Sequence, residues 1–142
     1  MGNTQSFNQH INFEDMQHVV SSSTRYLIIN TLAITDQTCL IRGSLHASQE
    51  EQVINTYLQN RQTNIHVVGY GRNANDTAAY TKQQQLLKMG FSRSYLYPGG
   101  LFEWLLLQDI YGGDEFPTTA KELDILKYKP VRALHTNLIE YN

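Results

Sequence analysis

The sequence has a single cysteine, Cys39, no long apolar run and no concentration of positive charge. One cysteine cannot form an internal disulfide, which fits a reducing compartment such as the cytoplasm. No apolar stretch approaches the roughly 20 residues that a membrane-spanning helix needs, and the N-terminus lacks the features of a secretory signal. The 11 Lys and Arg residues are scattered through a chain of net charge −2, so we expect no nucleic-acid partner.

The five histidines stand far apart, without carboxylates or thiols at the spacing of a metal site. We therefore expect no metal, and nothing in the sequence indicates a cofactor. With 142 residues, of which 41% are hydrophobic, the chain is long enough for one domain with its own core.

Short apolar runs bounded by polar residues predict buried strands. They lie at residues 26–30, 38–42, 65–70 and 94–98. Helical patterns alternate with them, at residues 12–20, 48–60, from 75 or 76 to 89, and 101–111. The last of these is apolar almost all round, which predicts a largely buried helix. The alternation predicts an α/β fold: a parallel sheet of about five strands with helices on both faces.

Helix signals support these boundaries. Asn12 is the expected N-cap of the first helix, and Ser48 with Glu51 reads as a capping box for the second. Gly90 is expected to end the third helix, with Phe91 placed for the apolar contact of a Schellman motif.

The loop after strand 65–70 is the candidate site, because sites in parallel sheets gather at the carboxyl ends of strands. It consists of Gly71, Arg72, Asn73, Ala74, Asn75, Asp76 and Thr77. It contains no Cys, Ser or His. Its backbone N–H groups could cradle an anion, helped by Arg72. We favour the alternative that the loop only turns the chain, because Asn75 or Asp76 already caps the next helix.

This loop resembles the active-site loop of the rhodanese homology domain, which is of the type Cys-Arg-Ser-Gly-Asn-Arg-Ser. Gly71 falls at the cysteine, Arg72 at the arginine, Asn75 at the asparagine and Thr77 at the closing serine. Other segments are similar to the family's Leu-X-X-X-Gly-Phe, Gly-Gly-to-Trp and His-Ile-Pro-Gly-Ala motifs: residues 86–91, 97–104 and 39–47. The resemblance covers residues 11–113 and implies a rhodanese-like fold.

The departures from the family pattern bear on function. Rhodanese-like sulfurtransferases carry sulfur on the loop cysteine, and the related phosphatases attack with it, whereas Gly71 has no side chain. Asp76 stands at the position of a second basic residue and would repel thiosulfate or phosphate. The family's Asp-X-Arg appears as Asn-Thr-Leu at 30–32. The resemblance therefore implies a non-catalytic member that acts as a protein-binding or scaffold module.

Two alternatives stay open at this stage. The chain could be a sulfurtransferase or phosphatase that uses a non-standard nucleophile, of which Cys39 is one candidate, or that borrows a cysteine from a partner. It could also be a structural virion component that forms oligomers. Against the first, free cysteines are among the most buried residue types, so we expect Cys39 in the core.

Residues 1–10 are polar and predict a flexible N-terminus. Their opening, MGNTQS, fits the N-myristoylation pattern Met-Gly-X-X-X-Ser, with Gly2 as the acceptor and Ser6 at the required position. A chance match is the alternative. One myristoyl chain supports only weak membrane association.

Residues 114–142 form a C-terminal extension beyond the region of resemblance. Thr119 and Glu122 read as a capping box, which predicts a short helix with Leu123, Ile125 and Leu126 that ends before residue 130. We expect the extension to pack on the domain. The alternative is a segment offered to a partner or to a second copy of the chain.

Overall fold

A computed structural model describes residues 9–134 and contains a parallel sheet with the strand order β2-β1-β3-β4. The strands are β1 (Tyr26–Asn30), β2 (Ser44–Leu45), β3 (His66–Tyr70) and β4 (Ser94–Tyr97). The predicted α/β class and parallel sheet are confirmed. The sheet has four strands within residues 9–134, not about five. Next to β4, a fifth position holds only a single parallel bridge between His10 and Leu96.

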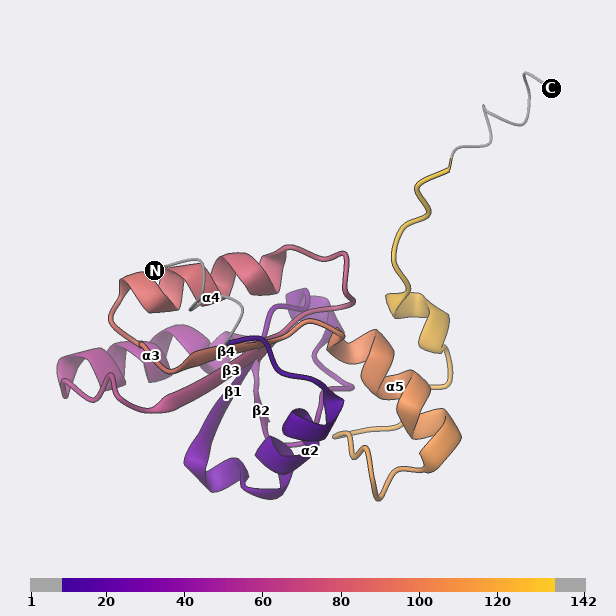
Figure 1. Ribbon diagram of the computed structural model, residues 1–142, viewed down its shortest axis with the longest axis horizontal. Helices are drawn as coiled ribbons and strands as arrows, with labels where there is room; N and C mark the ends of the chain where they lie inside the picture. The colour runs from indigo at the N-terminus through magenta and orange to yellow at the C-terminus, as the bar shows by residue number, and fades with distance from the viewer. Residues whose placement is uncertain (1–8, 135–142) are drawn as a thin grey trace.

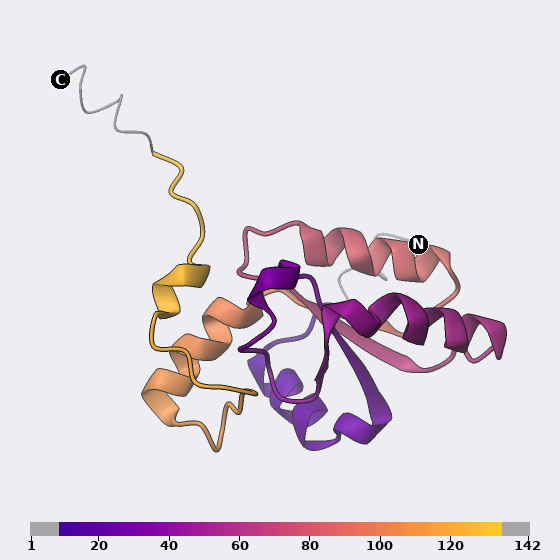
Figure 2. The ribbon, with the colours of Figure 1, turned by 180° about the vertical axis from the view of Figure 1, so that it is seen from behind.

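Helices cover both faces of the sheet, as predicted (Figure 1). They are α2 (Phe13–Ser21), α3 (Glu50–Gln59), α4 (Ala78–Lys88) and α5 (Gly100–Tyr111). Side chains along a strand point alternately to its two faces. Ile28 and Val68 accordingly pack in the larger core with α2 and α5, and Ile29 and Val67 pack in the smaller core with α3 and α4. Figure 2 shows α3 and α4 side by side on their face.

The predicted strand at 38–42 is wrong, although Cys39, Leu40 and Ile41 are buried as its apolar pattern required. The backbone of this segment bonds elsewhere. Leu40 accepts a hydrogen bond from the Thr119 N–H at 2.8 Å, and the Ile41 N–H donates to the Tyr70 hydroxyl at 3.1 Å. The strand that pairs with β1 at this edge is β2, which begins at Ser44, three residues after Ile41. The apolar run therefore predicted burial in the core correctly, but it did not predict which segment pairs with β1 in the sheet.

Two helix signals are confirmed. Asn12 caps α2, and its side chain and that of Asp15 form a reciprocal capping box. Gly90, with φ +104°, follows the end of α4, and the Phe91 N–H donates to the Leu86 carbonyl at 3.0 Å as in a Schellman motif. Phe91 is buried beside Leu86.

Two capping-box predictions are wrong because their hydroxyl groups bond to other partners. The Ser48 hydroxyl pairs with Nδ1 of His46 at 2.8 Å, and α3 begins after it without a side-chain cap. The Thr119 hydroxyl donates to the Thr38 carbonyl at 3.0 Å. In place of the predicted helix, residues 114–134 of the extension contain a 3₁₀ turn, η4 (Ile125–Tyr128).

Helix α5 is buried through its first half only. Leu101, Trp104 and Leu105 are buried, whereas Ile110 and Tyr111 are exposed. The predicted largely buried helix is therefore wrong for its last two turns. After α5 the chain turns back over the core: Phe116 is buried, and the Trp104 indole N–H donates to the Pro117 carbonyl at 3.1 Å.

Residues 1–8 and 135–142 lie outside the described residues, and Gly2 with the myristoylation pattern is among them. Within residues 9–134, every helix is too short or too polar to cross a bilayer.

Candidate functional site

The loop Gly71–Thr77 connects β3 to α4 at the carboxyl edge of the sheet, where the sequence placed it. The start of α5 packs against it. The Leu101 N–H donates to the Gly71 carbonyl at 2.9 Å, and the Phe102 N–H donates to the Arg72 carbonyl at 2.8 Å. A helix leaves its first N–H groups without partners inside the helix, and the loop carbonyls satisfy two of them.

Gly100 makes this close approach possible. Its φ is +69°, and a Cβ atom at this position would lie 2.7 Å from the Gly71 carbonyl oxygen. Only glycine fits such a contact without a shift of the backbone. The glycine pair of the YPGGLFEW segment thus seats α5 on the loop.

Three of the loop's N–H groups, those of Arg72, Asn75 and Asp76, are bonded within the loop. The Asp76 carboxylate accepts from the N–H of Arg72 at 3.3 Å and from that of Ala78 at 3.0 Å. The Asn73 side chain accepts from the Asn75 N–H at 3.0 Å, and the Asn73 carbonyl accepts from the Asp76 N–H at 3.2 Å. A carboxylate of the chain therefore occupies a position where an anion cradle would hold a ligand.

Gly71 is buried and has little free space for a side chain. An added Cβ would lie 3.0 Å from the Thr31 hydroxyl oxygen and 3.1 Å from an Asp76 carboxylate oxygen.

The predicted cap of α4 is right in part. Asp76 accepts from the Ala78 N–H, but the residue directly before α4 is Thr77, whose side chain makes no cap.

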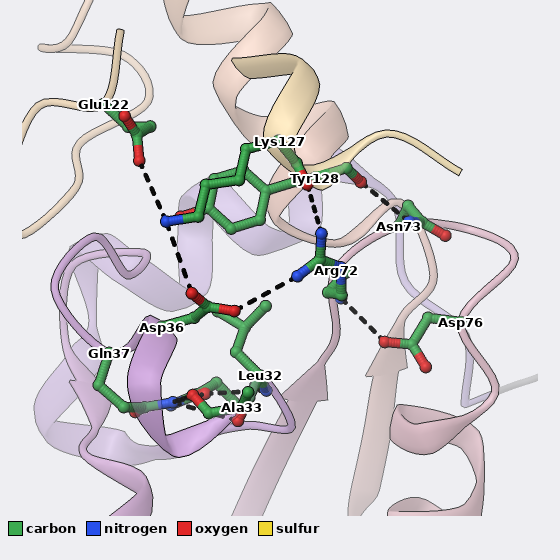
Figure 3. A network of polar contacts seen from close by, with 11 residues as sticks. Leu32, Ala33, Asp36, Gln37, Arg72, Asn73, Asp76, Glu122, Lys127 and Tyr128 are labelled. Atoms are coloured by element: carbon green, nitrogen blue, oxygen red, sulfur yellow. Dashed lines mark hydrogen bonds and ion pairs between the residues drawn. The ribbon is translucent and has the colours of Figure 1, made fainter. Parts of the chain in front are cut away.

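Arg72 points away from the loop toward the extension (Figure 3). Its guanidinium contacts Asp36 at 3.4 Å, donates to the Lys127 carbonyl, and lies over the Tyr128 ring at 5.4 Å from the centroid. The Asn73 amide donates to the Tyr128 carbonyl at 2.9 Å in a buried bond. The loop therefore holds η4 through two side chains that bond backbone carbonyls.

Asp36 also links the extension to the turn after β1. One of its carboxylate oxygens lies 3.5 Å from the Lys127 ammonium, which lies 3.7 Å from Glu122. Asp36 thus contacts both Arg72 and Lys127, so its charge is balanced at the junction of three segments (Figure 3).

A pocket of about 200 Å³ opens beside the loop. Gly71, Asn73 and Asp76 contribute to its wall, together with His10 and Tyr97. Among residues 9–134, neither Lys nor Arg lines this pocket, and Asp76 contributes negative charge, which would repel an anion.

Asn30, which falls at the acidic position of the segment that resembles Asp-X-Arg, pairs with Gln37 through buried side-chain amides. The Asn30 amide donates to Gln37 at 3.0 Å, and the Gln37 amide donates back to Asn30 at 2.8 Å. Asn30 also donates to the Leu45 carbonyl, and Gln37 accepts from the Ala47 N–H. The pair is nearly fully buried and joins β1 to the segment around β2.

Cys39 is buried away from solvent, and its thiol donates to the Ala120 carbonyl at 3.2 Å. Burial raises the pKa of this thiol above its ordinary value, which disfavours the reactive thiolate. Burial likewise raises the pKa of Tyr70 and Tyr97, and a hydrogen bond from Tyr97 to Glu103 at 2.5 Å adds to the shift for Tyr97.

Sequence reasoning identified the loop but missed its partners Thr31, Asp36, Lys127 and Tyr128. These residues come from the turn after β1 and from the extension, both distant from the loop in sequence. No local pattern in the sequence indicated that these residues contact the loop.

Among residues 9–134, no group of three or more His, Cys, Asp or Glu side chains is arranged to hold a metal ion.

Comparison with solved structures identifies proteins whose folds are similar to that of this chain. A protein from Lactobacillus plantarum matches with a TM-score of 0.58 and 18% identity, over 74% of this chain and 88% of that chain. A thiosulfate sulfurtransferase from Pseudomonas aeruginosa matches with a TM-score of 0.56 and 18% identity, over 84% of this chain and 23% of that chain. A single-domain sulfurtransferase from Saccharomyces cerevisiae matches with a TM-score of 0.52 and 14% identity, over 77% and 95%.

No protein-family model matches the chain, and the search of curated proteins found no match. At these identities the structural likeness concerns the fold alone. The fold of this chain is rhodanese-like, as the sequence motifs implied.

Proposed function

We propose that this chain is a non-catalytic rhodanese-like module that binds a protein partner through a surface including Gly71–Thr77. The observation that carries the proposal is the chemistry of this loop. It offers no thiol, Gly71 stands at the position that resembles the family's cysteine, and the Asp76 carboxylate accepts from the N–H groups of Arg72 and Ala78. Such a loop keeps the frame of a sulfur-carrying site without a group that could form the covalent intermediate.

The state of Cys39 supports the same proposal. A sulfurtransferase needs a thiolate that solvent and substrate can reach. Cys39 is 3% exposed and bonded to Ala120, and burial raises its pKa. A structural role as a small core residue accounts for the buried position of Cys39, so no catalytic role is needed to explain it.

Two turnover assays test the proposal. The purified chain is assayed for thiosulfate–cyanide sulfur transfer and for phosphatase activity with p-nitrophenyl phosphate, beside a Cys39→Ser variant. We expect both proteins to stay at the background rate. Turnover by the unaltered chain that disappears in Cys39→Ser would contradict the proposal.

A catalytic role is the second candidate, because two structures of similar fold are sulfurtransferases. It requires a non-standard nucleophile or a cysteine supplied by a partner. Turnover that survives Cys39→Ser would favour this candidate. A third candidate, a structural virion component, predicts higher homo-oligomers in sedimentation of the purified chain.

The proposal includes a weak membrane tether. In a cytoplasmic protein, a myristoyl chain on Gly2 would add an affinity of about 10⁴ M⁻¹ for lipid. No cluster of Lys or Arg follows the motif, since the first basic residue is Arg25. Association through Gly2 would therefore be transient unless a partner or oligomerisation strengthens it.

A further inference from the structure

One segment of the chain already binds the loop. Residues 122–128, which we call the strap, cross the loop and contribute one deeply buried side chain, Tyr128, which is 1% exposed. Leu123 and Leu126, by contrast, are 83% and 63% exposed. The strap therefore sits on the domain like a short peptide ligand with a single aromatic anchor.

The groups that hold the strap recognise features that many peptides share. Arg72 and Asn73 donate to the backbone carbonyls of Lys127 and Tyr128, so these bonds do not depend on the side chains of the strap. The Arg72 guanidinium also lies over the Tyr128 ring. Asp36 accepts the Lys127 ammonium and thereby adds a preference for positive charge before the aromatic residue.

Resting on the proposed function, we infer that this face of the domain is a peptide-docking site and that the strap is its intramolecular occupant. The partner segment carries a basic residue followed by a tyrosine, as Lys127 and Tyr128 do. Its aromatic ring replaces that of Tyr128 under Arg72, its basic residue pairs with Asp36, and its backbone carbonyls accept from Arg72 and Asn73.

Exchange of the strap for a partner requires Tyr128 to leave the core and Ile125 to leave its partly buried contact with it, whereas Leu123 and Leu126 are already exposed. The strap's ion pairs involve a Lys127 side chain that is 42% exposed, so water and salt screen them. Residues 116–120 stay fixed on the domain through the buried Phe116 and the bond from the Thr119 N–H to the Leu40 carbonyl, so release of the strap would move only the residues that follow.

A labelled peptide with the sequence of residues 122–130, ELDILKYKP, tests the inference. Its binding to the full chain is compared with its binding to a full-length Tyr128→Ala variant, with folding checked by circular dichroism. The apparent affinity is reduced by the fraction of molecules whose site is already occupied. We expect the variant to bind the peptide about tenfold more tightly than the unaltered chain.

Matched controls identify the site. A peptide with alanine in place of its tyrosine should not bind, and adding Asn73→Ala to Tyr128→Ala should weaken binding. Asp36→Asn should weaken the Lys-containing peptide but not one with alanine before the tyrosine. If Tyr128→Ala does not fold, Lys127→Ala takes its place, because it weakens the strap without opening the core.

Failure to bind the peptide by a folded variant with a weakened strap would overturn the docking site. That result leaves the proposed absence of catalysis untouched. Turnover in the sulfur-transfer assay would have the opposite meaning: it would contradict the proposed function and leave peptide binding to be judged on its own measurement.

Discussion

The Asp76 carboxylate accepts a hydrogen bond from the backbone N–H of Arg72 at 3.3 Å, four residues before it in the same loop. A second bond, from the Ala78 N–H at 3.0 Å, ties the same carboxylate to the start of α4. Asp76 thus supplies a negative charge inside a loop that, in catalytic proteins of this fold, would receive one from substrate. Because this negative charge belongs to the chain itself, a rhodanese-like fold can be intact while the loop lacks the proposed sulfur chemistry.

Introducing a cysteine at Gly71 should not by itself create a sulfurtransferase. The Cβ of a Gly71→Cys variant would lie 3.1 Å from an Asp76 oxygen, and a nearby carboxylate raises the pKa of a thiol. We expect no sulfur transfer by Gly71→Cys and measurable transfer once Asp76→Ala is added. Thiol titration of both variants supplies the control. Activity of Gly71→Cys alone would mean that Asp76 is not the obstacle.

Gly100 should tolerate substitution much less well than Gly112. Both have positive φ, but a Cβ at Gly100 would meet the Gly71 carbonyl oxygen at 2.7 Å, whereas nothing lies within 4 Å at Gly112. Gly112→Ala therefore reports the backbone cost alone. Urea unfolding should show that Gly100→Ala loses about 1–3 kcal/mol more stability than Gly112→Ala. Equal losses would show that α5 is not packed against the loop as closely as described.

The Asn30–Gln37 pair should behave as a coupled unit. Asn30→Ala removes both bonds to Gln37 and also those to the Leu32 N–H and the Leu45 carbonyl, and it should lower the free energy of unfolding by about 2 kcal/mol. Gln37→Leu should cost a similar amount. In the double variant the losses should be less than additive, by about 0.5–3 kcal/mol in a double-mutant cycle. Simple additivity would argue against the reciprocal amide bonds.

Stability should fall at alkaline pH because of Tyr70 and Tyr97. Their folded pKa values are raised above the ordinary value of about 10, so the folded state keeps protons that the unfolded chain releases. Their contribution is complete below pH 10 and is lost progressively as the pH rises above it. Tyr97→Phe should reduce the slope of unfolding free energy against pH above 10. An unchanged slope in Tyr97→Phe would contradict this expectation.

Lipidation of Gly2 can be measured directly. Co-expression with an N-myristoyltransferase should add one myristoyl group to the unaltered chain and none to Gly2→Ala, as read from the intact mass. A myristate adduct would direct the search for partners to membrane fractions. An unmodified Gly2 would remove the membrane from the proposed function.

Elements with strong local signals were predicted well from the sequence. The run at 65–70, the Asn12 cap and the Gly90–Phe91 helix end depend on neighbouring residues, and each is present in the structure. The position of the candidate loop followed from them. The order of the motifs predicted a rhodanese-like fold, and the fold comparisons confirm it.

The errors arose where long-range contacts override local preference. The hydroxyls of Ser48 and Thr119 suited helix caps but bond His46 and Thr38 instead. The apolar run at 38–42 is buried, yet its backbone bonds the extension and the Tyr70 hydroxyl. The contacts of Arg72 with Asp36 and η4 join segments about 36 and 55 residues apart, which no window of sequence can reveal.

As a proposed non-catalytic module, the chain should not carry sulfur on any of its residues. The most direct measurement is the intact mass of the purified protein after incubation with thiosulfate, which detects a covalent adduct even when turnover is slow. A non-catalytic module should show no species heavier by one sulfur atom, with or without Cys39→Ser. A persulfide on the unaltered chain that is absent from Cys39→Ser would contradict the account, because it would make Cys39 a working sulfur carrier.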